Sequence, residues 1–356
     1  MRIINPATGS IITEVGEDDV VSVSAKLVNA REYQKEWAAI SLEERISILN
    51  QFKKLLQEDA AHLSRVLTEE VGKPIAQSRN EIRGACTRIN WMLEHAEKYL
   101  SDETMHTEPG LVEKIVYEPL GVVANISAWN YPYLVGVNVI IPALLAGNAV
   151  LYKPSEFATL TGMEIEKRLV KAGVPSSVFQ TIIGAAEAGH ALLDLPLDGY
   201  FFTGSYNTGK YIYEQVASKM VPCQCELGGK DPLYVADDVN DIKSVAAATA
   251  DGAFYNNGQS CCAVERIYVH ENIADDYIDA FVNEVKSWKI GDPLSDGVYL
   301  GALTRAAQMD SLDAQVKDAL SKGATLLTGG RRIPVPGNFF RTNGVDKCGS
   351  QYAVDA

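Results

Sequence analysis

Cysteine and histidine are scarce in this chain, whose 356 residues include six cysteines and five histidines. The cysteines lack the spacing of a disulfide framework, so we expect reduced thiols and a cytoplasmic protein. They also lack Cys-x-x-Cys pairs, and no histidine cluster accompanies them, so we expect no metal site. Residues 1–29 contain no hydrophobic region followed by a cleavage site, so we expect no signal peptide.

Positive charge is outnumbered, because 32 Lys and Arg face 46 Asp and Glu and leave a formal net charge of −14. An acidic surface repels phosphate backbones and anionic headgroups. The composition therefore argues against nucleic acid and against a membrane as partners.

Charged residues of either sign are missing from Pro119 to Tyr152. A hydropathy scan marks residues 133–152 as a candidate membrane helix. Glycine, asparagine and proline interrupt this run, however, and no basic cluster flanks it. A buried β-α-β unit, whose strands are apolar on both faces, explains the run better.

Apolar residues make up 47% of the chain, which is enough for about two domains. Residues 18–100 show helical periodicity, and Ser41 with Glu44 forms a capping box at the start of one helix. Residues 101–119 contain short extended pieces and predict a hairpin arm.

Strands and helices alternate from residue 120 onward. The expected strands are 121–127, 149–152, 178–183 and 199–203, and the helices between them are 134–146, 161–172 and 185–193. A turn at 204–209 then opens a helix that ends near residue 219. A second block repeats the pattern, with strands at 233–235 and 266–270 and helices at 241–255 and 274–288. This alternation predicts parallel sheets with right-handed crossovers.

A glycine-rich turn, Gly204-Ser-Tyr-Asn-Thr-Gly209, follows an apolar strand and precedes a helix. Backbone N–H groups and a helix N-terminus at such a turn can bind a phosphate. With Lys210 the turn also fits a nucleoside-triphosphate loop, but Tyr211 stands where a magnesium-binding Ser or Thr is needed. An ordinary strand-to-helix turn remains the alternative.

Two further segments carry polar groups at strand ends. Lys153-Pro-Ser-Glu156 follows an expected strand, where open α/β sheets bind ligands. A lysine and a glutamate there can hydrogen-bond sugar hydroxyls, although a solvated Lys–Glu pair is the simpler interpretation. Glu226-Leu-Gly-Gly-Lys230 places a glutamate at a strand end, and it matters only if the fold brings it near a reactive group.

Adjacent thiols occur in Gly258-Gln-Ser-Cys261-Cys262, after a polar turn that follows a helix. Cysteine is usually a small buried hydrophobe, and this is an unusual place for packing residues. A nucleophilic thiol is the functional interpretation.

Together these segments resemble the aldehyde dehydrogenase family. The resemblance rests on five motifs in register, supported by the opening Asn5-Pro-Ala-Thr-Gly9, and it covers residues 3 to about 340. The motifs are Ala128-Trp-Asn-Tyr-Pro132, Lys153-Pro-Ser-Glu156, Phe202-Thr-Gly-Ser205, Glu226-Leu-Gly-Gly-Lys230 and Gly258-Gln-Ser-Cys261.

The resemblance implies a catalytic role for three residues. Cys261, which is two residues after Gln259, attacks the aldehyde, and the side-chain amide of Asn130 stabilises the oxyanion together with the Cys261 backbone N–H. Glu226 activates the water that hydrolyses the thioester.

The resemblance also implies NAD as cofactor. Lys153 and Glu156 hold its adenosine ribose, and Trp129 lines the channel for cofactor and substrate. Ser205 meets the pyrophosphate, while Gly204 and Gly209 leave room for it.

The implied fold is α/β. Residues 1–100 and 120–226 form a parallel-sheet, Rossmann-like cofactor domain, residues 227–340 a second α/β catalytic domain, and residues 101–119 the first part of a β oligomerisation arm. A small-molecule aldehyde and a homo-oligomer follow as expected partners.

The family pattern stops after Gly337-Asn-Phe-Phe340. The family's later Glu-x-Phe-Gly-Pro motif is absent, so we expect a truncated member with an incomplete catalytic domain and a perturbed oligomer. Codons for residues 341–356 can be chosen so that another reading frame gives Pro-Thr-Val-Leu and His-Ser-Met, which the family has at this point. We interpret residues 341–356 as an aberrant, frameshifted tail.

Two alternatives stay open. An acylating dehydrogenase passes its acyl group to coenzyme A, but a hydrolytic base such as Glu226 argues against it. The other alternative is an inactive, truncated homologue that binds nucleotide or a partner without turnover.

Overall fold

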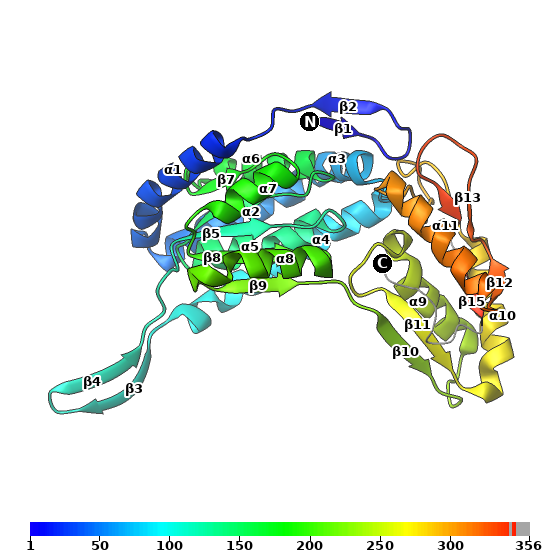
Figure 1. Cartoon of the computed structure of the whole chain (residues 1–356). Coiled ribbons are helices and arrows are strands. Elements are labelled where there is room, and N and C mark those ends of the chain that lie inside the picture. The colour runs from blue at the N-terminus through cyan, green and yellow to red at the C-terminus, as the bar shows by residue number, and fades with distance from the viewer. Residues whose placement is uncertain (342–343, 347–356) are drawn as a thin grey trace. The chain divides into compact units, whose positions relative to one another are not determined.

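The computed structural model describes residues 1–341 and 344–346 and divides them into two compact units (Figure 1). The first unit consists of Met1, Glu14–Val66 and Arg79–Leu227. The second consists of Arg2–Thr13, Leu67–Ser78 and the described residues from Gly228 onward.

A five-stranded parallel sheet forms the centre of the first unit. Its order is β7-β6-β5-β8-β9, so the chain starts in the middle, builds outward to one edge and then crosses back to build the other. The strands are β5 (Val122–Ile126), β6 (Ala149–Lys153), β7 (Phe179–Thr181), β8 (Gly199–Thr203) and β9 (Cys223–Glu226). The strand order reverses between β5 and β8, and such a reversal is where doubly wound sheets bind ligands.

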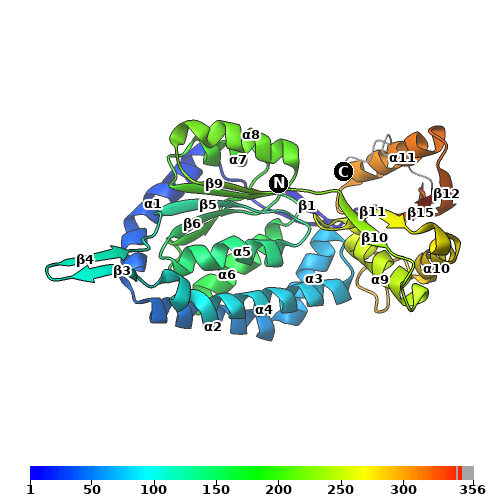
Figure 2. The same cartoon turned by 90° about the horizontal axis from the view of Figure 1, so that it is seen from below.

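Helices cover both faces of this sheet (Figure 2). On one face α5 (Pro132–Leu145) and α6 (Thr159–Ala172) pack beneath the strands, and α2 (Leu42–Glu58) packs against them in turn. On the other face lie α1 (Val20–Ala39), α7 (Ala186–Asp194) and α8 (Tyr206–Val216). Because both faces are covered, β5 and β6 are buried almost throughout and largely apolar, apart from Asn125 and Lys153.

The uncharged run at residues 119–152 forms β5, α5 and β6, which confirms the expected β-α-β unit. Within the described residues, no helix is both long enough and apolar enough to span a membrane.

A two-stranded antiparallel hairpin projects from the first unit (Figure 1). It consists of β3 (Glu103–Glu108) and β4 (Leu111–Ile115), and every residue of both strands is exposed. The expected hairpin at residues 101–119 is therefore present.

The second unit contains a smaller α/β layer. Its strands β10 (Asp231–Val235) and β11 (Val264–Val269) pair in parallel, and α9 (Ile242–Phe254) and α10 (Ala274–Ser287) pack on each other beside them. A buried cluster that includes Val235, Ala250 and Phe281 forms its core.

Further elements complete the second unit. They are β1 (Arg2–Ile4), which pairs with β2 (Ile11–Glu14), α11 (Ala306–Ser321), β12 (Thr325–Thr328), β13 (Arg331–Arg332), β14 (Phe340–Arg341) and β15 (Gly344–Asp346). β15 pairs with β12 and β14 with β13, both antiparallel.

The unit boundaries differ from the predicted division at two segments. Residues 2–13 and 67–78 belong to the second unit, so α3 (Ala60–Val71) and α4 (Ile75–Leu100) each contribute to both units. Long-range backbone hydrogen bonds explain the difference, because Pro6 O accepts from Asn338 N and Gly72 O accepts from Ala302 N. Helical periodicity locates a helix but does not say which unit it packs against.

The expected aberrant tail, residues 341–356, falls largely outside the described residues. Arg341 ends β14 and residues 344–346 form β15; residues 342–343 and 347–356 are not described.

Candidate functional site

The carboxyl ends of four neighbouring strands in the first unit carry the residues that the sequence singles out. Because all strands of the sheet are parallel, these ends lie along one edge. The candidate residues there are Trp129 and Asn130 after β5, Lys153 and Glu156 at and after β6, Gly204 and Ser205 after β8, and Glu226 at the end of β9. This border of the sheet, formed by the carboxyl ends of the strands, includes the strand-order reversal, where a ligand is expected; it is called the ligand edge below.

Lys153 is the last residue of β6, and only 6% of its side chain is exposed. Its ammonium group donates to Pro154 O at 3.4 Å. Burial lowers the pKa of Lys153, and the charge of the nearby Glu156 opposes this shift. Glu156 is half-buried and accepts a hydrogen bond from Ser155 Oγ at 3.1 Å. Lys153 is therefore a buried cation at the ligand edge rather than a member of a solvated surface pair.

Helix α8 begins at this edge, directly after β8. Ser205 is its N-cap, and the hydroxyl accepts from Thr208 N at 3.4 Å and donates to Thr208 Oγ1 at 2.9 Å. The first turn contains no acidic residue that would neutralise the positive end of the helix dipole. An anionic group is favoured at such a helix start.

The sequence predicts a turn that contains both Gly204 and Gly209, but only Gly204 lies before the helix. Helix α8 starts at Tyr206 because Ser205 caps it, so Gly209 is a buried residue of the helix. A Cβ on Gly209 would come within 2.5 Å of Leu227 Cδ2, and one on Gly204 within 2.4 Å of the Phe202 ring. Both glycines thus make room for side chains of this chain, and their cofactor role stays a prediction.

Trp129 and Asn130 are half-buried in the loop between β5 and α5. Asn130 Oδ1 accepts from Tyr131 N at 3.1 Å. Tyr131 is the N-cap of α5 but makes no side-chain capping bond. The hydrogen-bond acceptor for the start of α5 is instead Glu81 on α4, whose carboxylate accepts from Tyr133 N at 2.8 Å. Sequence reasoning missed Glu81, because no local signal links it to this loop.

Glu226 ends the edge strand β9, and its side chain is exposed. Its backbone oxygen accepts from Gly204 N at 3.0 Å, which ties the end of β9 to the turn before α8. The Glu226 backbone thus lies at the same end of the sheet as Ser205.

In the second unit, Cys261 follows a turn of unusual backbone conformation. Asn256, Asn257 and Gly258 have φ values of 55°, 59° and 75°, a run of three left-handed residues. Asparagine and glycine are the residues that tolerate this region, which explains their presence after α9. The turn redirects the chain so that Cys261 and Cys262 are both exposed.

The two thiols differ in their surroundings. Cys262 Sγ lies 3.4 Å from Ser260 Oγ, within a hydrogen bond. Cys261 has Gly229 against its backbone, since a Cβ on Gly229 would lie 3.1 Å from Cys261 O. Gly229 of the Glu226–Lys230 motif therefore contacts the segment 256–262, which carries both thiols and is called the cysteine loop below.

Gln259 braces the same loop. Its side chain donates to Asn256 O at 3.0 Å and accepts from Thr304 N at 3.1 Å. Sequence reasoning used Gln259 only to mark the position of Cys261. The structure shows that it connects the left-handed turn to the segment around Thr304.

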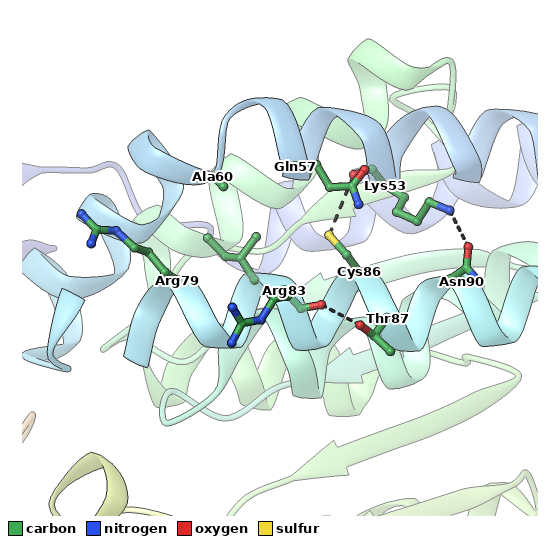
Figure 3. A pocket seen from close by; sticks show the side chains of 9 residues that line it. Lys53, Gln57, Ala60, Arg79, Arg83, Cys86, Thr87 and Asn90 are labelled. Atoms are coloured by element: carbon green, nitrogen blue, oxygen red, sulfur yellow. Dashed lines mark hydrogen bonds between the residues drawn. The ribbon is translucent and has the colours of Figure 1, made fainter. Parts of the chain in front are cut away.

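A pocket of about 430 Å³ lies elsewhere in the first unit, between α2 and α4 (Figure 3). It is lined by residues that include Lys53, Arg79, Arg83 and the buried thiol of Cys86. None of the candidate residues lines it, so it is separate from the ligand edge of the sheet.

Comparison with known proteins gives consistent matches along the whole described chain. The model of the aldehyde dehydrogenase family matches residues 1–351. The chain is 34% identical to 3,6-anhydro-alpha-L-galactose dehydrogenase of Streptomyces coelicolor over 335 residues, covering 93% of this chain and 68% of that protein. It is 36% identical to peroxisomal aminoaldehyde dehydrogenase 1 of Pisum sativum over 342 residues, covering 92% of this chain and 67% of that protein.

A solved structure of similar fold is that of PnpE in complex with nicotinamide adenine dinucleotide. Its TM-score is 0.93 at 28% identity, and the match covers 97% of this chain and 72% of that one. The chain thus spans about two thirds to three quarters of the length of the proteins it matches.

Proposed function

This chain belongs to the aldehyde dehydrogenase family, and on that premise we propose that it oxidises an aldehyde to a carboxylic acid with NAD+ through Cys261. The observation that carries the proposal is the exposed Cys261 thiol, presented by a braced left-handed turn. A thiol suits this chemistry because it is a good nucleophile and later a good leaving group.

The first step forms a bond between Cys261 Sγ and the aldehyde carbon, which gives a thiohemiacetal oxyanion. The side-chain amide of Asn130 and the backbone N–H of Cys261 donate hydrogen bonds to that oxygen. NAD+, when bound, supplies the acceptor for the hydride that leaves this carbon. The enzyme then carries a thioester on Cys261.

Glu226 completes the reaction as a general base. Its carboxylate takes a proton from the water that attacks the thioester, and the Cys261 thiolate leaves as the acid forms. The position of Glu226 in the chain supports this role. It precedes Gly229 by three residues, so an extended backbone holds their Cα atoms within about 11 Å, and Gly229 packs against Cys261.

The ligand edge of the first unit fits a dinucleotide, which makes this unit the proposed cofactor domain. Lys153 and Glu156 hydrogen-bond the hydroxyls of the adenosine ribose, because a buried ammonium and a half-buried carboxylate suit neutral hydroxyl partners. Ser205 and the first turn of α8 meet the pyrophosphate. Trp129 lines the channel beside Asn130. The second unit, which carries Cys261, is the proposed catalytic domain.

The hairpin of β3 and β4 is the proposed oligomerisation arm. All its residues are exposed, including Met105, Leu111 and Val112, and a two-stranded sheet leaves both outer edges unpaired. Pairing with a second copy of the chain would satisfy those edges, so we propose a homo-oligomer.

The test is an NAD+ reduction assay on the purified chain with a panel of small aldehydes. We expect NADH to form with at least one aldehyde and no NADH to form with Cys261→Ala. Binding of NAD+ without turnover on any aldehyde would contradict the proposal and favour a nucleotide-binding homologue.

A further inference from the structure

Gln77 is a buried amide on α4 that joins two loops of the second unit. Only 4% of it is exposed. Its Oε1 accepts from Asn256 N at 2.9 Å, and its Nε2 donates to Tyr299 O at 2.9 Å. Both ends of the side chain are therefore committed to backbone groups, one of which belongs to the loop that carries Cys261.

The partner Asn256 is the first residue of the left-handed run. It is fully buried, and its φ of 55° is a conformation that residues other than glycine adopt rarely. Such residues persist where the surrounding structure holds them in place. The bond from Gln77 fixes the backbone N–H of Asn256 at the point where the chain enters this conformation.

Asn256 in turn sets the path of the chain toward Cys261. Asn256 O accepts from Gln259 N and from Gln259 Nε2, both at 3.0 Å, and Asn256 Nδ2 donates to Gln259 O at 3.3 Å. Ser260 N then donates to Gly258 O at 2.8 Å. Hydrogen bonds thus connect Gln77 through Asn256 to Gln259, two residues before Cys261, and a separate bond closes Ser260 onto Gly258 in the same turn.

We propose that Gln77 is a positioning residue for Cys261. It holds the left-handed turn and thereby sets the direction in which the thiol is presented to the aldehyde. The effect on catalysis rests on the proposed function, since it takes Cys261 as the nucleophile. The effect of Gln77 on the conformation of the cysteine loop does not depend on that role.

The test is alkylation by iodoacetamide, in which a thiolate sulfur bonds to the reagent carbon and iodide leaves. The ratio of rate constants for Cys261 and Cys262 is measured by peptide mass spectrometry. Cys262 serves as the reference because it lies in the same loop and is also exposed. The measurement needs neither cofactor nor turnover, and a destabilised control variant separates a change of the loop from a general loss of folded protein.

Gln77→Met keeps the length of the side chain and removes both hydrogen bonds. Gln77→Glu keeps an acceptor for Asn256 N. We expect the alkylation ratio to change by about threefold or more in Gln77→Met and by less in Gln77→Glu, because only the first variant releases the turn. In an active chain, kcat should fall about tenfold in Gln77→Met while the Kd for NAD+ is unchanged.

The control is Val316→Ala, which removes a buried side chain from α11 of the same unit without touching the loop's hydrogen bonds. It should lower stability and leave the alkylation ratio as in wild type. An unchanged ratio in Gln77→Met, or an equal change in Val316→Ala, would overturn the proposal and leave Gln77 a purely structural residue. Failure of the proposed function would show separately, as turnover that survives in Cys261→Ala.

Discussion

The buried carboxylate of Glu81 accepts the backbone N–H of Tyr133 at 2.8 Å, at the start of α5. This helix has no capping side chain at Tyr131 and no acidic residue in its first turn. Glu81, from α4, thus supplies the anionic acceptor that the N-terminus of α5 lacks. Asn130 immediately precedes the N-cap residue Tyr131, so the bond also holds the loop that carries Asn130.

Removal of the Glu81 side chain should destabilise the first unit. Glu81→Ala leaves a buried N–H without its acceptor, so we expect the free energy of unfolding to fall by about 1–3 kcal/mol in a denaturant titration. Glu81→Gln keeps an oxygen acceptor and should lose less. Glu97→Ala, at an exposed position of the same helix, is the control. Equal losses in Glu81→Ala and Glu97→Ala would show that the cap contributes nothing.

The two thiols of the cysteine loop should differ in their effect on turnover. Cys261→Ala should lower the rate of NADH formation by about a thousandfold or more, whereas Cys262→Ala should retain much of the activity. Mass spectrometry after reaction with an electrophilic aldehyde analogue should locate the label on Cys261. Label confined to Cys262 would reverse the assignment of the nucleophile.

Loss of the proposed base should uncouple the two halves of the reaction. Glu226→Gln should still form the thioester and release one equivalent of NADH in a burst, after which steady turnover falls by about 10²–10⁴-fold. Rapid-mixing absorbance of NADH measures both phases. Full steady-state turnover in this variant would exclude Glu226 as the base.

The charge of Glu156 should set a preference for NAD+ over NADP+. A carboxylate accepts hydrogen bonds from ribose hydroxyls and repels a 2′-phosphate. Glu156→Gln should therefore lower the ratio of the Kd for NADP+ to the Kd for NAD+ by roughly tenfold. Glu214→Gln, which makes the same charge change on the exposed face of α8, should leave the ratio unchanged. Tighter binding of NADP+ than NAD+ by the wild-type chain at equal salt would contradict this prediction.

Alkaline pH should destabilise the first unit. Burial raises the pKa of the Cys86 thiol, which faces Lys53 O in the pocket between α2 and α4 (Figure 3), from 9.0 to about 11. Burial likewise raises the pKa of Tyr200 from 10.0 to about 12. Each group ionises more easily in the unfolded chain than in the folded one. Its contribution to the free energy of unfolding is therefore complete below its pKa in the unfolded chain and is lost as the pH rises through its pKa in the folded chain.

Denaturant titrations between pH 8 and pH 12 measure this loss, with the fall expected to begin near pH 9 where unfolded Cys86 ionises. Burial also raises the pKa of Cys223 from 9.0 to about 11, so Cys86→Ala should reduce the earlier part of the fall and leave the parts that Cys223 and Tyr200 cause. An identical pH dependence in wild type and Cys86→Ala would show that the thiol is not coupled to folding.

The sequence by itself determined the elements and the motif positions. The sequence pattern located β8 at Gly199–Thr203 as observed, and located α9 and α10 to within a residue or so at each end. The spacing of Ser41 and Glu44 likewise predicted the start of a helix, and the Ser41 hydroxyl accepts from Glu44 N at 3.1 Å. These features depend on neighbours in the chain, which a sequence displays directly.

The tertiary structure decided which of these elements meet. The order β7-β6-β5-β8-β9 pairs Ile126, at the end of β5, with Phe202 in β8, which lies 76 positions further along the chain. It also decided that Gln77 and Glu81, one turn apart on α4, bind backbone groups 179 and 52 residues away. No periodicity encodes such partners, because a buried side chain finds an unpaired backbone N–H only after the chain has packed.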